Sequence, residues 1–425
     1  MRLSIESTQK QKHKATVAMA AFAAVTLVAA LGFGVVHRAD AAGVTFVVAA
    51  DGKATSNNCN SSVVTPYTTV SAAIAAASAG DTVKVCPGAY TENVVIDKAL
   101  TLKGAKAGDS VNARTFGGAN ESTVTGLVTV QAANVKVDGF SLTNPGQGLG
   151  VLVKTAANNA VIKHNFVKTV GSNTFVGPTV GVYLELGPDN ALVSGNAISD
   201  VQSQTGSAQG VLVGDSTSAD PSLNTRIDNN MVTNITSVNR GAYGIQLNNG
   251  ASTASTATGY TEAKLRGNTI KNLSGNWVHA IGLEGETPNV EVSNNTISNL
   301  TATALLPAGS PVGVFFEDNP FFFTGEVNQN SLSVGATGFG VAVAPALTTQ
   351  YASLSVDATC NWWGNGSGPS SVATGSGSMV SAGVDYQPWL KSSNLNRDCD
   401  SNDHHGHHGG WNSHDDNNDD DWRDD

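Results

Sequence analysis

The stretch Gly313-Val-Phe-Phe-Glu317, followed by Gly325-Glu-Val-Asn-Gln-Asn-Ser-Leu332, is one copy of a unit that recurs along most of the chain. The unit combines a short strand pattern, Gly-[Val/Ile]-x-apolar-x, with a second pattern, [Val/Ile/Leu]-x-x-Asn-x-apolar. The second pattern places an asparagine three residues after an apolar residue at Asn165, Asn196, Asn230, Asn268, Asn295 and Asn330. These asparagines are 27 to 38 residues apart, and a repeat of that size is typical of a solenoid or a propeller.

The spacing of strands within the unit selects one of these architectures. No long helical pattern follows Gly80, which excludes βαβ units, and the aromatic motifs of propeller blades are missing. We therefore predict an all-β fold, a parallel β-helix in which equivalent residues of successive coils lie about 4.8 Å apart. In such a column each asparagine is expected to adopt the left-handed turn conformation and to hydrogen-bond to the neighbouring coils.

The chain begins with features of a secretory signal, which we assign to residues 1–41. Three lysines precede an uncharged apolar run, Ala15–Val36, and Ala39-Asp-Ala41 is a small-x-small cleavage site. The run is also close to the roughly 20 residues that span a bilayer, so an uncleaved membrane anchor is the alternative. Both interpretations place the body outside the cytoplasm, secreted or at the cell surface.

Residues 42–104 are assigned to an N-terminal cap and the first coils. Thr69–Ala79 carries Val70, Ala73, Ile74 and Ala77 at helical spacing, with Thr69 as N-cap and Gly80 as the stop. A short capping α-helix here would cover the open end of the stack. Regular coils are assigned to residues 105–390, where Trp362-Trp363 is interpreted as a plug of the C-terminal end.

The amino-acid composition limits the classes of molecule that the protein is expected to bind. The chain has 425 residues, of which 13% are charged, and a net charge of −11. This acidic balance argues against nucleic acid as a partner, and we expect a monomer.

Three segments resemble known β-helix proteins. Tyr67–Ala77, Gly80–Val94 and Ala99–Gly104 are similar to the opening of pectin methylesterases and of bacterial right-handed β-helix repeat proteins, and Asp357–Gly364 is similar to the closing segment of secreted bacterial β-helix proteins. The resemblance implies the pectin-lyase-like superfamily and a right-handed helix over about residues 44–390. The catalytic signatures of pectin methylesterases, polygalacturonases and pectate lyases do not occur, so it implies the fold and none of these three activities.

Four cysteines, Cys59, Cys86, Cys360 and Cys399, allow three pairings in an oxidising compartment. Seven or more coils of about 4.8 Å separate the ends of the solenoid by over roughly 30 Å. A disulfide needs Cα atoms within about 7 Å, so we predict Cys59–Cys86 and Cys360–Cys399. Metal binding by these cysteines is the weaker interpretation, because the chain contains no Cys-x-x-Cys pair.

The strand pattern also predicts an outward-facing surface. In Gly-[Val/Ile]-x-apolar-x the second and fourth residues should face the core, and the third and fifth the solvent. Hydrogen-bonding groups beside aromatic rings suit the binding of sugars. The outward residues predicted to bind a polysaccharide are Lys154, Tyr183, Glu185, Gln246, Asn248 and Phe315.

Glu284 and Glu317 are predicted to lie about 5 Å apart on neighbouring coils, which would raise the pKa of one carboxyl group. They are candidates for the acid and nucleophile of a retaining glycosidase. With Glu286 and Asp318 they could instead bind Ca²⁺, the one cofactor considered, and no cofactor is required. The alternative is a solvated acidic face. His164 and His279 are interpreted as turn or rim residues and not as catalytic bases.

The segment 391–425 is expected to be a disordered acidic tail. Its histidines suggest a loose metal site as a second interpretation, with the candidate ligands His404, His405, His407 and His408.

The leading functional hypothesis is a non-catalytic module that binds an extracellular or cell-wall polysaccharide or has a structural role. The alternative is a carbohydrate-active enzyme, a polysaccharide lyase, hydrolase or pectinesterase-like protein. It would use the face formed by Glu185, Asn248, Glu284 and Glu317.

Overall fold

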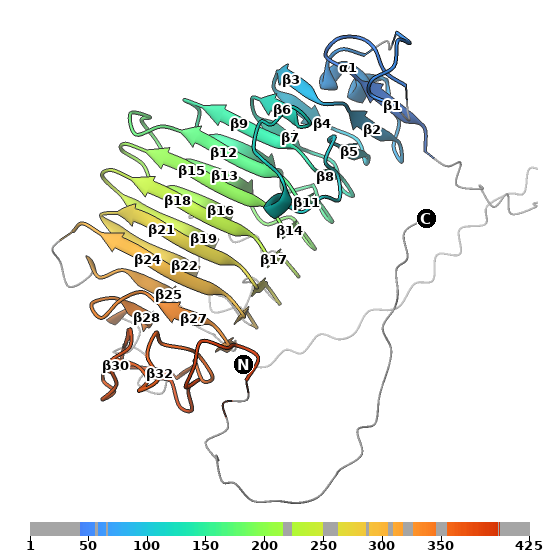
Figure 1. Ribbon diagram of the computed structural model, residues 1–425. Coiled ribbons are helices and arrows are strands. Elements are labelled where there is room, and N and C mark those ends of the chain that lie inside the picture. Colours follow the sequence, from blue (N-terminus) through green and yellow to red (C-terminus); the bar gives the residue numbers. More distant parts are fainter. Residues whose placement is uncertain are drawn as a thin grey trace, which may run out of the picture. The chain divides into compact units, whose positions relative to one another are not determined.

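A computed structural model describes residues 43–55, 58–64, 67–215, 223–249, 262–285, 289–304, 309–317, 326–345, 355–397 and 399. In these residues the strands of successive coils pair in parallel and form three long sheets (Figure 1). The fold is a right-handed parallel β-helix with one short α-helix at its N-terminal end. The repeat predicts the β-helix, the resemblance to β-helix proteins implies its right hand, and the pattern of Thr69–Ala79 predicts the helix. Within the same residues, no helix is long and apolar enough to cross a membrane.

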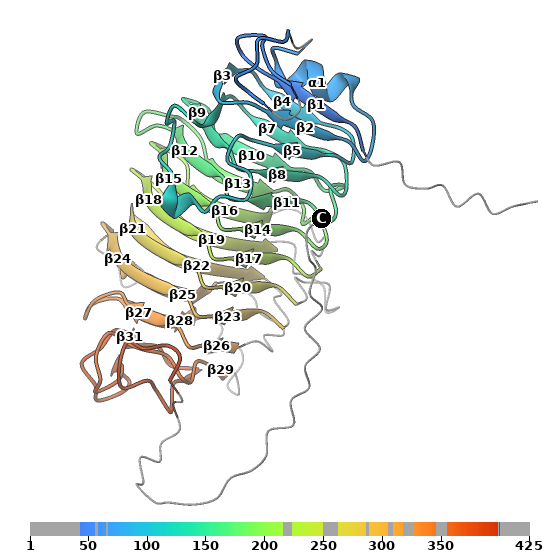
Figure 2. The same cartoon turned by 45° about the vertical axis from the view of Figure 1, so that its right-hand side comes forward.

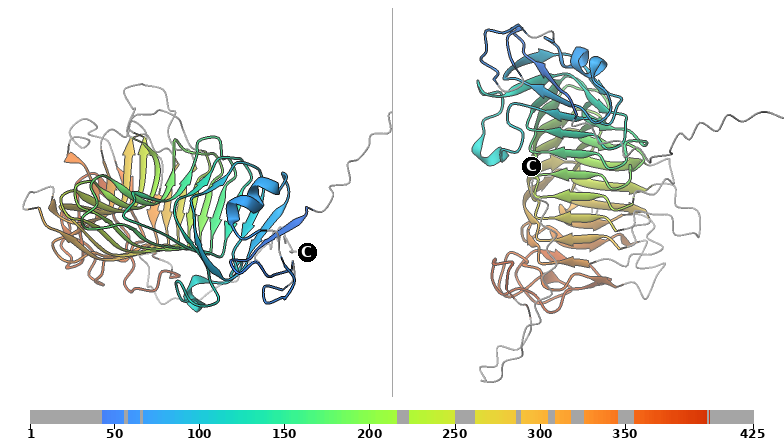
Figure 3. Two further views of the ribbon diagram at one scale, coloured as in Figure 1. Left: turned by 90° about the horizontal axis from the view of Figure 1, so that it is seen from above. Right: turned by 90° about the vertical axis from the view of Figure 1, so that its right-hand side faces the viewer.

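From β2 to β28 the coils visit the sheets in the order 1, 2, 3, and Figures 2 and 3 show the strands of each sheet stacked along the solenoid. Sheet 1 has 12 strands: β1 (Thr45–Val48), β2 (Thr82–Val85), β5 (Thr101–Lys103), β8 (Lys136–Asp138), β11 (Val161–Lys163), β14 (Leu192–Ser194), β17 (Arg226–Asp228), β20 (Lys264–Arg266), β23 (Glu291–Ser293), β26 (Glu326–Asn328), β29 (Val356–Asp357) and β32 (Val384–Asp385). Sheet 2 has nine: β3 (Gly88–Thr91), β6 (Ser122–Thr125), β9 (Ser141–Pro145), β12 (Phe166–Gly171), β15 (Ala197–Ser203), β18 (Met231–Ser237), β21 (Thr269–Gly275), β24 (Thr296–Ala302) and β27 (Ser331–Ser333). Sheet 3 has 11: β4 (Val94–Ile96), β7 (Val128–Val130), β10 (Leu149–Val153), β13 (Thr179–Leu184), β16 (Ala208–Asp215), β19 (Gly241–Asn249), β22 (Trp277–Gly285), β25 (Val312–Phe316), β28 (Phe339–Val343), β31 (Met379–Val380) and β30 (Ser370–Ser371).

The core is built from columns of aliphatic side chains. In sheet 3 the strand register stacks Val151 on Val182, then Val211, Ile245 and Ile281, all with no exposed surface. Because every coil contributes an equivalent residue, each new coil buries its apolar side chains against the coil before it.

The asparagine column is confirmed as a buried ladder between sheets 1 and 2. The Oδ1 atom of Asn230 accepts hydrogen bonds from the backbone N and the Nδ2 of Asn196, at 3.0 Å each. The Nδ2 of Asn230 donates to the carbonyl of Val193 at 2.8 Å and to Oδ1 of Asn268 at 3.1 Å. The ladder continues to Asn361, which the repeat pattern did not include.

The predicted left-handed conformation of these asparagines is wrong. Positive φ occurs instead at the residue before each one, for example at His164 (50°), Asn229 (55°) and Gly267 (64°). The backbone changes direction at that preceding residue. The side-chain amide of the ladder asparagine can therefore point along the axis of the stack. Asparagine and glycine are the residues that tolerate such a φ best.

The cap helix α1 (Val70–Ala76) begins as predicted, since the Thr69 side chain accepts a hydrogen bond from the backbone N of Ala72. It ends three residues earlier than predicted, at Ala76, and Ala77 is extended. The helix is followed in the chain by a 3₁₀ turn, η1 (Val111–Ala113), within a loop between β5 and β6.

Both predicted disulfides are present, Cys59–Cys86 and Cys360–Cys399, with Cα–Cα distances of 5.5 and 5.2 Å. Two disulfides are typical of an oxidising, extracellular environment. At the C-terminal end Trp363 is fully buried in the core, as expected of a plug.

Candidate functional site

The outer face of sheet 3 gathers aromatic, amide and carboxylate side chains on β16, β19, β22 and β25. The strand register aligns Gln209 with Tyr243 and Tyr243 with His279. A second column aligns Gln246, Gly282 and Phe315. Since adjacent strands are about 4.8 Å apart, these side chains come from four successive coils and form one continuous surface.

His279 is at the centre of this surface. Its Nδ1 lies 2.6 Å from Oε1 of Glu317, and the imidazole is almost fully buried. Two rings flank it: Tyr243 edge-on with 5.2 Å between ring centroids, and Phe315 at 4.5 Å. We call Tyr243, Trp277, His279, Phe315 and Glu317 the His279 cluster. The interpretation of His279 as a turn or rim residue is wrong, because it lies within β22.

Gly282 explains how Glu317 reaches the imidazole. A Cβ atom on Gly282 would lie 3.0 Å from Oε1 of Glu317 and 3.2 Å from Cδ1 of Tyr243. The missing side chain therefore opens the space over β22 that the Glu317 carboxylate occupies. A carboxylate that accepts a hydrogen bond from Nδ1–H leaves Nε2 as the remaining ring nitrogen for proton transfer or hydrogen bonding.

Tyr243 is held in its neutral form. Trp277 donates its indole N–H to the hydroxyl of Tyr243 at 2.9 Å. Burial of the phenol, followed by the nearby charge of Glu317, raises the pKa of Tyr243 well above its ordinary value. The hydroxyl consequently remains protonated at all physiological pH values.

A row of amides runs from Glu284 across two strands. Nε2 of Gln246 donates to Oε2 of Glu284 at 3.2 Å, and Nε2 of Gln209 donates to Oε1 of Gln246 at 3.0 Å. We call Gln209, Gln246 and Glu284 the amide row. Its last acceptor, Oε1 of Gln209, is buried without a hydrogen-bond partner.

The two predicted catalytic carboxylates, Glu284 and Glu317, lie on neighbouring coils. The backbone N of Glu317 donates to the carbonyl of Leu283 at 2.9 Å. Their side chains bind different groups, however, since Glu284 accepts from Gln246 and Glu317 contacts His279. Each carboxylate thus belongs to its own hydrogen-bonded group.

The residues predicted to bind substrate divide into two sets. Gln246, Asn248 and Phe315 lie at or beside the His279 cluster. Lys154 and Glu185 follow β10 and β13 and form an ion pair with each other, at 2.8 Å. Tyr183 is half-buried in β13, the strand that Glu185 follows, and so lies beside the second set.

Metal binding has no support in the described part of the chain, which contains no cluster of three or more His, Cys, Asp or Glu side chains suited to a metal ion. The candidate calcium ligands Glu286 and Asp318 lie outside the described residues, as do the tail residues His404, His405, His407 and His408.

Reasoning from the sequence missed Gln209 and Tyr243, and it placed His279 at a turn or rim. A signal was present, because each of them directly precedes the first residue of the repeated strand pattern, at Gly210, Gly244 and Ala280. A Cβ atom on Gly210 or Gly244 would meet core side chains, so these positions face inward and the residue before each one faces outward.

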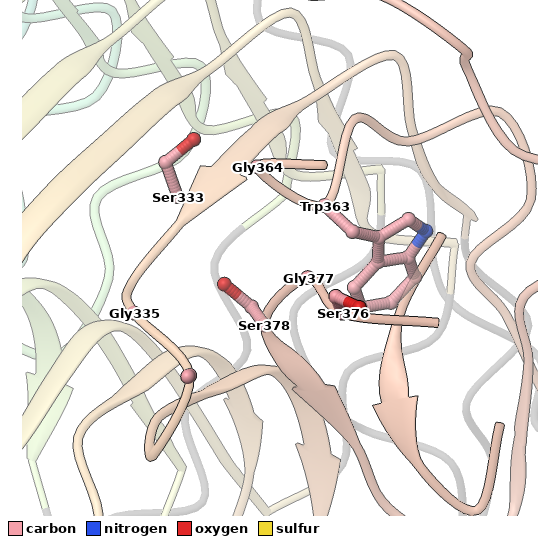
Figure 4. Close-up of a pocket in the computed structure, with 8 residues that line it drawn as sticks. Ser333, Gly335, Trp363, Gly364, Ser376, Gly377 and Ser378 are labelled. Carbon is pink, nitrogen blue, oxygen red and sulfur yellow. The ribbon is translucent and has the colours of Figure 1, made fainter. Parts of the chain in front are cut away.

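A separate cavity of about 240 Å³ lies near the C-terminal end (Figure 4). Its lining includes Ser333, Trp363 and Ser378, and none of its lining residues is titratable. The Ser378 hydroxyl is already used, since it donates to the carbonyl of Leu332 and accepts from the backbone N of Val334. We therefore place the candidate site on sheet 3 and not in this cavity.

Residues 52–259 match a family described as protein of unknown function (DUF1565). The chain resembles this family over just under half of its length. The match agrees with a β-helix repeat and ends before β22, so it does not include His279, Glu284 or Glu317. The curated proteins and the solved structures gave no match.

Proposed function

We propose that the protein is a pectin-lyase-like β-helix that binds an extracellular polysaccharide on the outer face of sheet 3 without cleaving it. It acts as a monomer, secreted or at the cell surface, and does not bind nucleic acid. The observation that carries the proposal is the row of ring and hydrogen-bonding side chains on four successive strands.

The geometry of the sheet suits a linear polymer. Equivalent side chains repeat about every 4.8 Å along the solenoid, so a chain lying across the strands meets similar groups at each coil. Phe315 and Tyr183 are half-buried and offer rings for stacking on sugars. Asn248 adds an amide group that can pair with hydroxyls.

The test is retention of the purified protein on polysaccharide gels. Phe315→Ala and Tyr183→Ala should each weaken binding about tenfold, which corresponds to about 1.4 kcal/mol. Phe116→Ala is the matched control, since Phe116 is a half-buried aromatic that packs on Phe166, beside sheet 2. Equal effects of all three variants would argue against a binding surface on sheet 3.

The His279 cluster favours a carbohydrate-active enzyme as the second candidate. A buried imidazole held by a carboxylate can transfer protons, and Glu284 lies on the same strand, β22, as this imidazole. In that case Glu317→Gln should abolish the release of reducing or unsaturated ends while retention on the polymer persists. Any requirement for Ca²⁺, through Glu284, Glu286 and Asp318, would appear as loss of binding or product release after chelation.

A further inference from the structure

The sheet 3 face between β16 and β28 has an unusual charge composition. From residue 204 to 345 the chain contains five lysines and arginines: Arg226, Arg240, Lys264, Arg266 and Lys271. Three of these lie on sheet 1 and Lys271 lies on sheet 2, while Arg240 precedes β19, at the end of the strand remote from Asn248. The sheet 3 strands themselves, and the segments that follow them, have no lysine or arginine in this range.

The same face carries the carboxylates of Glu284 and Glu317. Glu317 has its partner in His279, and Glu284 is bonded to an uncharged amide. A polymer of uronic acids would bring its own carboxylates against these groups. Like charges repel more strongly in a partly buried site than in open water, so such a polymer is disfavoured.

The amide row adds an independent indication of the ligand. Because the Glu284 carboxylate only accepts hydrogen bonds, it fixes Gln246 with Nε2 toward it and Oε1 toward Gln209. Gln209 must then present its own Nε2 to Gln246, which leaves Oε1 as the unpaired end. Gln209 is 8% exposed, and a buried carbonyl without a donor is costly. A sugar hydroxyl can supply that donor, so the amide row favours a hydroxyl-bearing ligand, while the carboxylates of the face discriminate against uronic acids.

We propose that this face selects uncharged, hydroxyl-rich polysaccharides over polyuronates, with Oε1 of Gln209 accepting a hydrogen bond from a sugar hydroxyl. The inference rests on the proposed binding function and narrows its substrate class. It assigns different roles to the two ends of the amide row: Glu284 repels anionic sugars, and Gln209 recognises a sugar hydroxyl.

The experiment compares the full chain on three soluble polymers: an uncharged glucan, polygalacturonate and the cationic polymer chitosan. Affinity electrophoresis is run at low and physiological salt, with and without Ca²⁺. We expect the glucan to bind at least about tenfold more tightly than polygalacturonate, with little dependence of glucan binding on salt. The double variant Glu284→Gln/Glu317→Gln should reduce this discrimination by raising the affinity for polygalacturonate.

Gln209→Leu should lower glucan affinity about tenfold, because it removes the unpaired acceptor. The matched control is Gln202→Leu, on sheet 2. Unfolding midpoints of both variants verify that they fold, and the double carboxylate variant tests the charge argument if Gln209→Leu does not fold.

The possible failures are distinguishable. Tighter binding of polygalacturonate than of glucan, with or without Ca²⁺, overturns the neutral-substrate inference and leaves the proposed binding function standing. Tighter binding of chitosan than of glucan that disappears at physiological salt also overturns the neutral-substrate inference and leaves the proposed binding function standing. Failure of all three polymers to bind overturns the proposed function and the inference together.

Discussion

A single ladder asparagine satisfies several buried groups at once. Asn230 has almost no exposed surface, and its amide links the Asn196 amide, the Val193 carbonyl and Asn268. The backbone N–H of Asn196 has its acceptor in this side chain. An aliphatic residue of similar size could fill the space and would leave these groups unpaired.

Asn230→Ala should therefore lower the free energy of unfolding by about 3 kcal/mol or more, through lost hydrogen bonds and orphaned buried groups. Asn272→Gly should cost about 1 kcal/mol or less, because Asn272 lies in an exposed row of asparagines between Asn234 and Asn299 and glycine tolerates its φ of 59°. Urea unfolding followed by circular dichroism measures both. Comparable losses in the two variants would contradict a special role for the buried ladder.

Tyr90 gives the stability a dependence on alkaline pH. Its hydroxyl donates to the carbonyl of Cys86 at 2.9 Å, and burial raises the pKa of Tyr90 to about 12. An ordinary tyrosine has a pKa of about 10, so the native state binds this proton more tightly than the unfolded state. The resulting stability is fully present below about pH 10 and is lost as the pH rises toward 12. The raised pKa of Tyr243 acts in the same direction.

We expect the free energy of unfolding to fall by up to about 3 kcal/mol over this pH range, from a shift of about two units in Tyr90. Denaturant titrations at several alkaline pH values, made within minutes to protect the disulfides, measure the slope. The Tyr90→Phe variant should show a smaller slope. An unchanged slope would mean that other groups produce the dependence.

At the scale of elements, the cap helix α1 depends on two charges from later in the chain. Glu92 accepts hydrogen bonds from the backbone N–H groups of Val70 and Ser71 at the helix N-terminus. Lys98 donates to the carbonyls of Ile74, Ala75 and Ala77 at 2.9–3.0 Å. A carboxylate at the first turn and an ammonium at the last both oppose the helix dipole. Lys98 also gives hydrogen-bond partners to the Ala75 and Ala77 carbonyls at the end of the helix, where carbonyls have no partner within the helix.

Lys98→Met should destabilise the protein by about 1–2 kcal/mol and increase proteolysis within residues 67–80. Methionine keeps most of the apolar length of the side chain and removes its three hydrogen bonds. Lys103→Met, at an exposed position on β5, serves as the control. If the two variants are cleaved equally fast, the contacts of Lys98 do not hold the helix in place.

The difference between α1 and the coils shows what the sequence could and could not reveal. The repeat shows which residues face the core and which cysteines can meet. Both follow from a local strand pattern that recurs at a constant spacing along the solenoid axis. The end of α1 depends on Lys98, more than 20 residues later, and no local pattern encodes that contact. The candidate site is similar: Glu317 reaches His279 across 38 residues, over a glycine whose role appears only once the strands are in register.

At the scale of the whole solenoid, each coil contacts only the coils before and after it. Such a stack is least stable at its ends, where a coil has one neighbour instead of two. The two disulfides lie at those ends, Cys59–Cys86 beside the cap and Cys360–Cys399 after β29. Each closes a loop, of 27 and 39 residues in sequence separation, and is expected to contribute about 3–4 kcal/mol by restricting the unfolded chain.

Removing one disulfide should therefore loosen one end and leave the other unchanged. In the Cys360→Ser/Cys399→Ser variant we expect faster amide hydrogen exchange in β26, β29 and β32, unchanged exchange in β2 and β5, and the slowest exchange in β16 and β19. The Cys59→Ser/Cys86→Ser variant is the matched control and should show the reverse pattern. Faster exchange across all coils in either variant would mean that the stack unfolds as one cooperative unit, and that the disulfides stabilise the whole and not its ends.

Under the expected pattern, loss of the C-terminal disulfide should leave polysaccharide retention intact, because β16, β19 and β22 lie several coils away from β29.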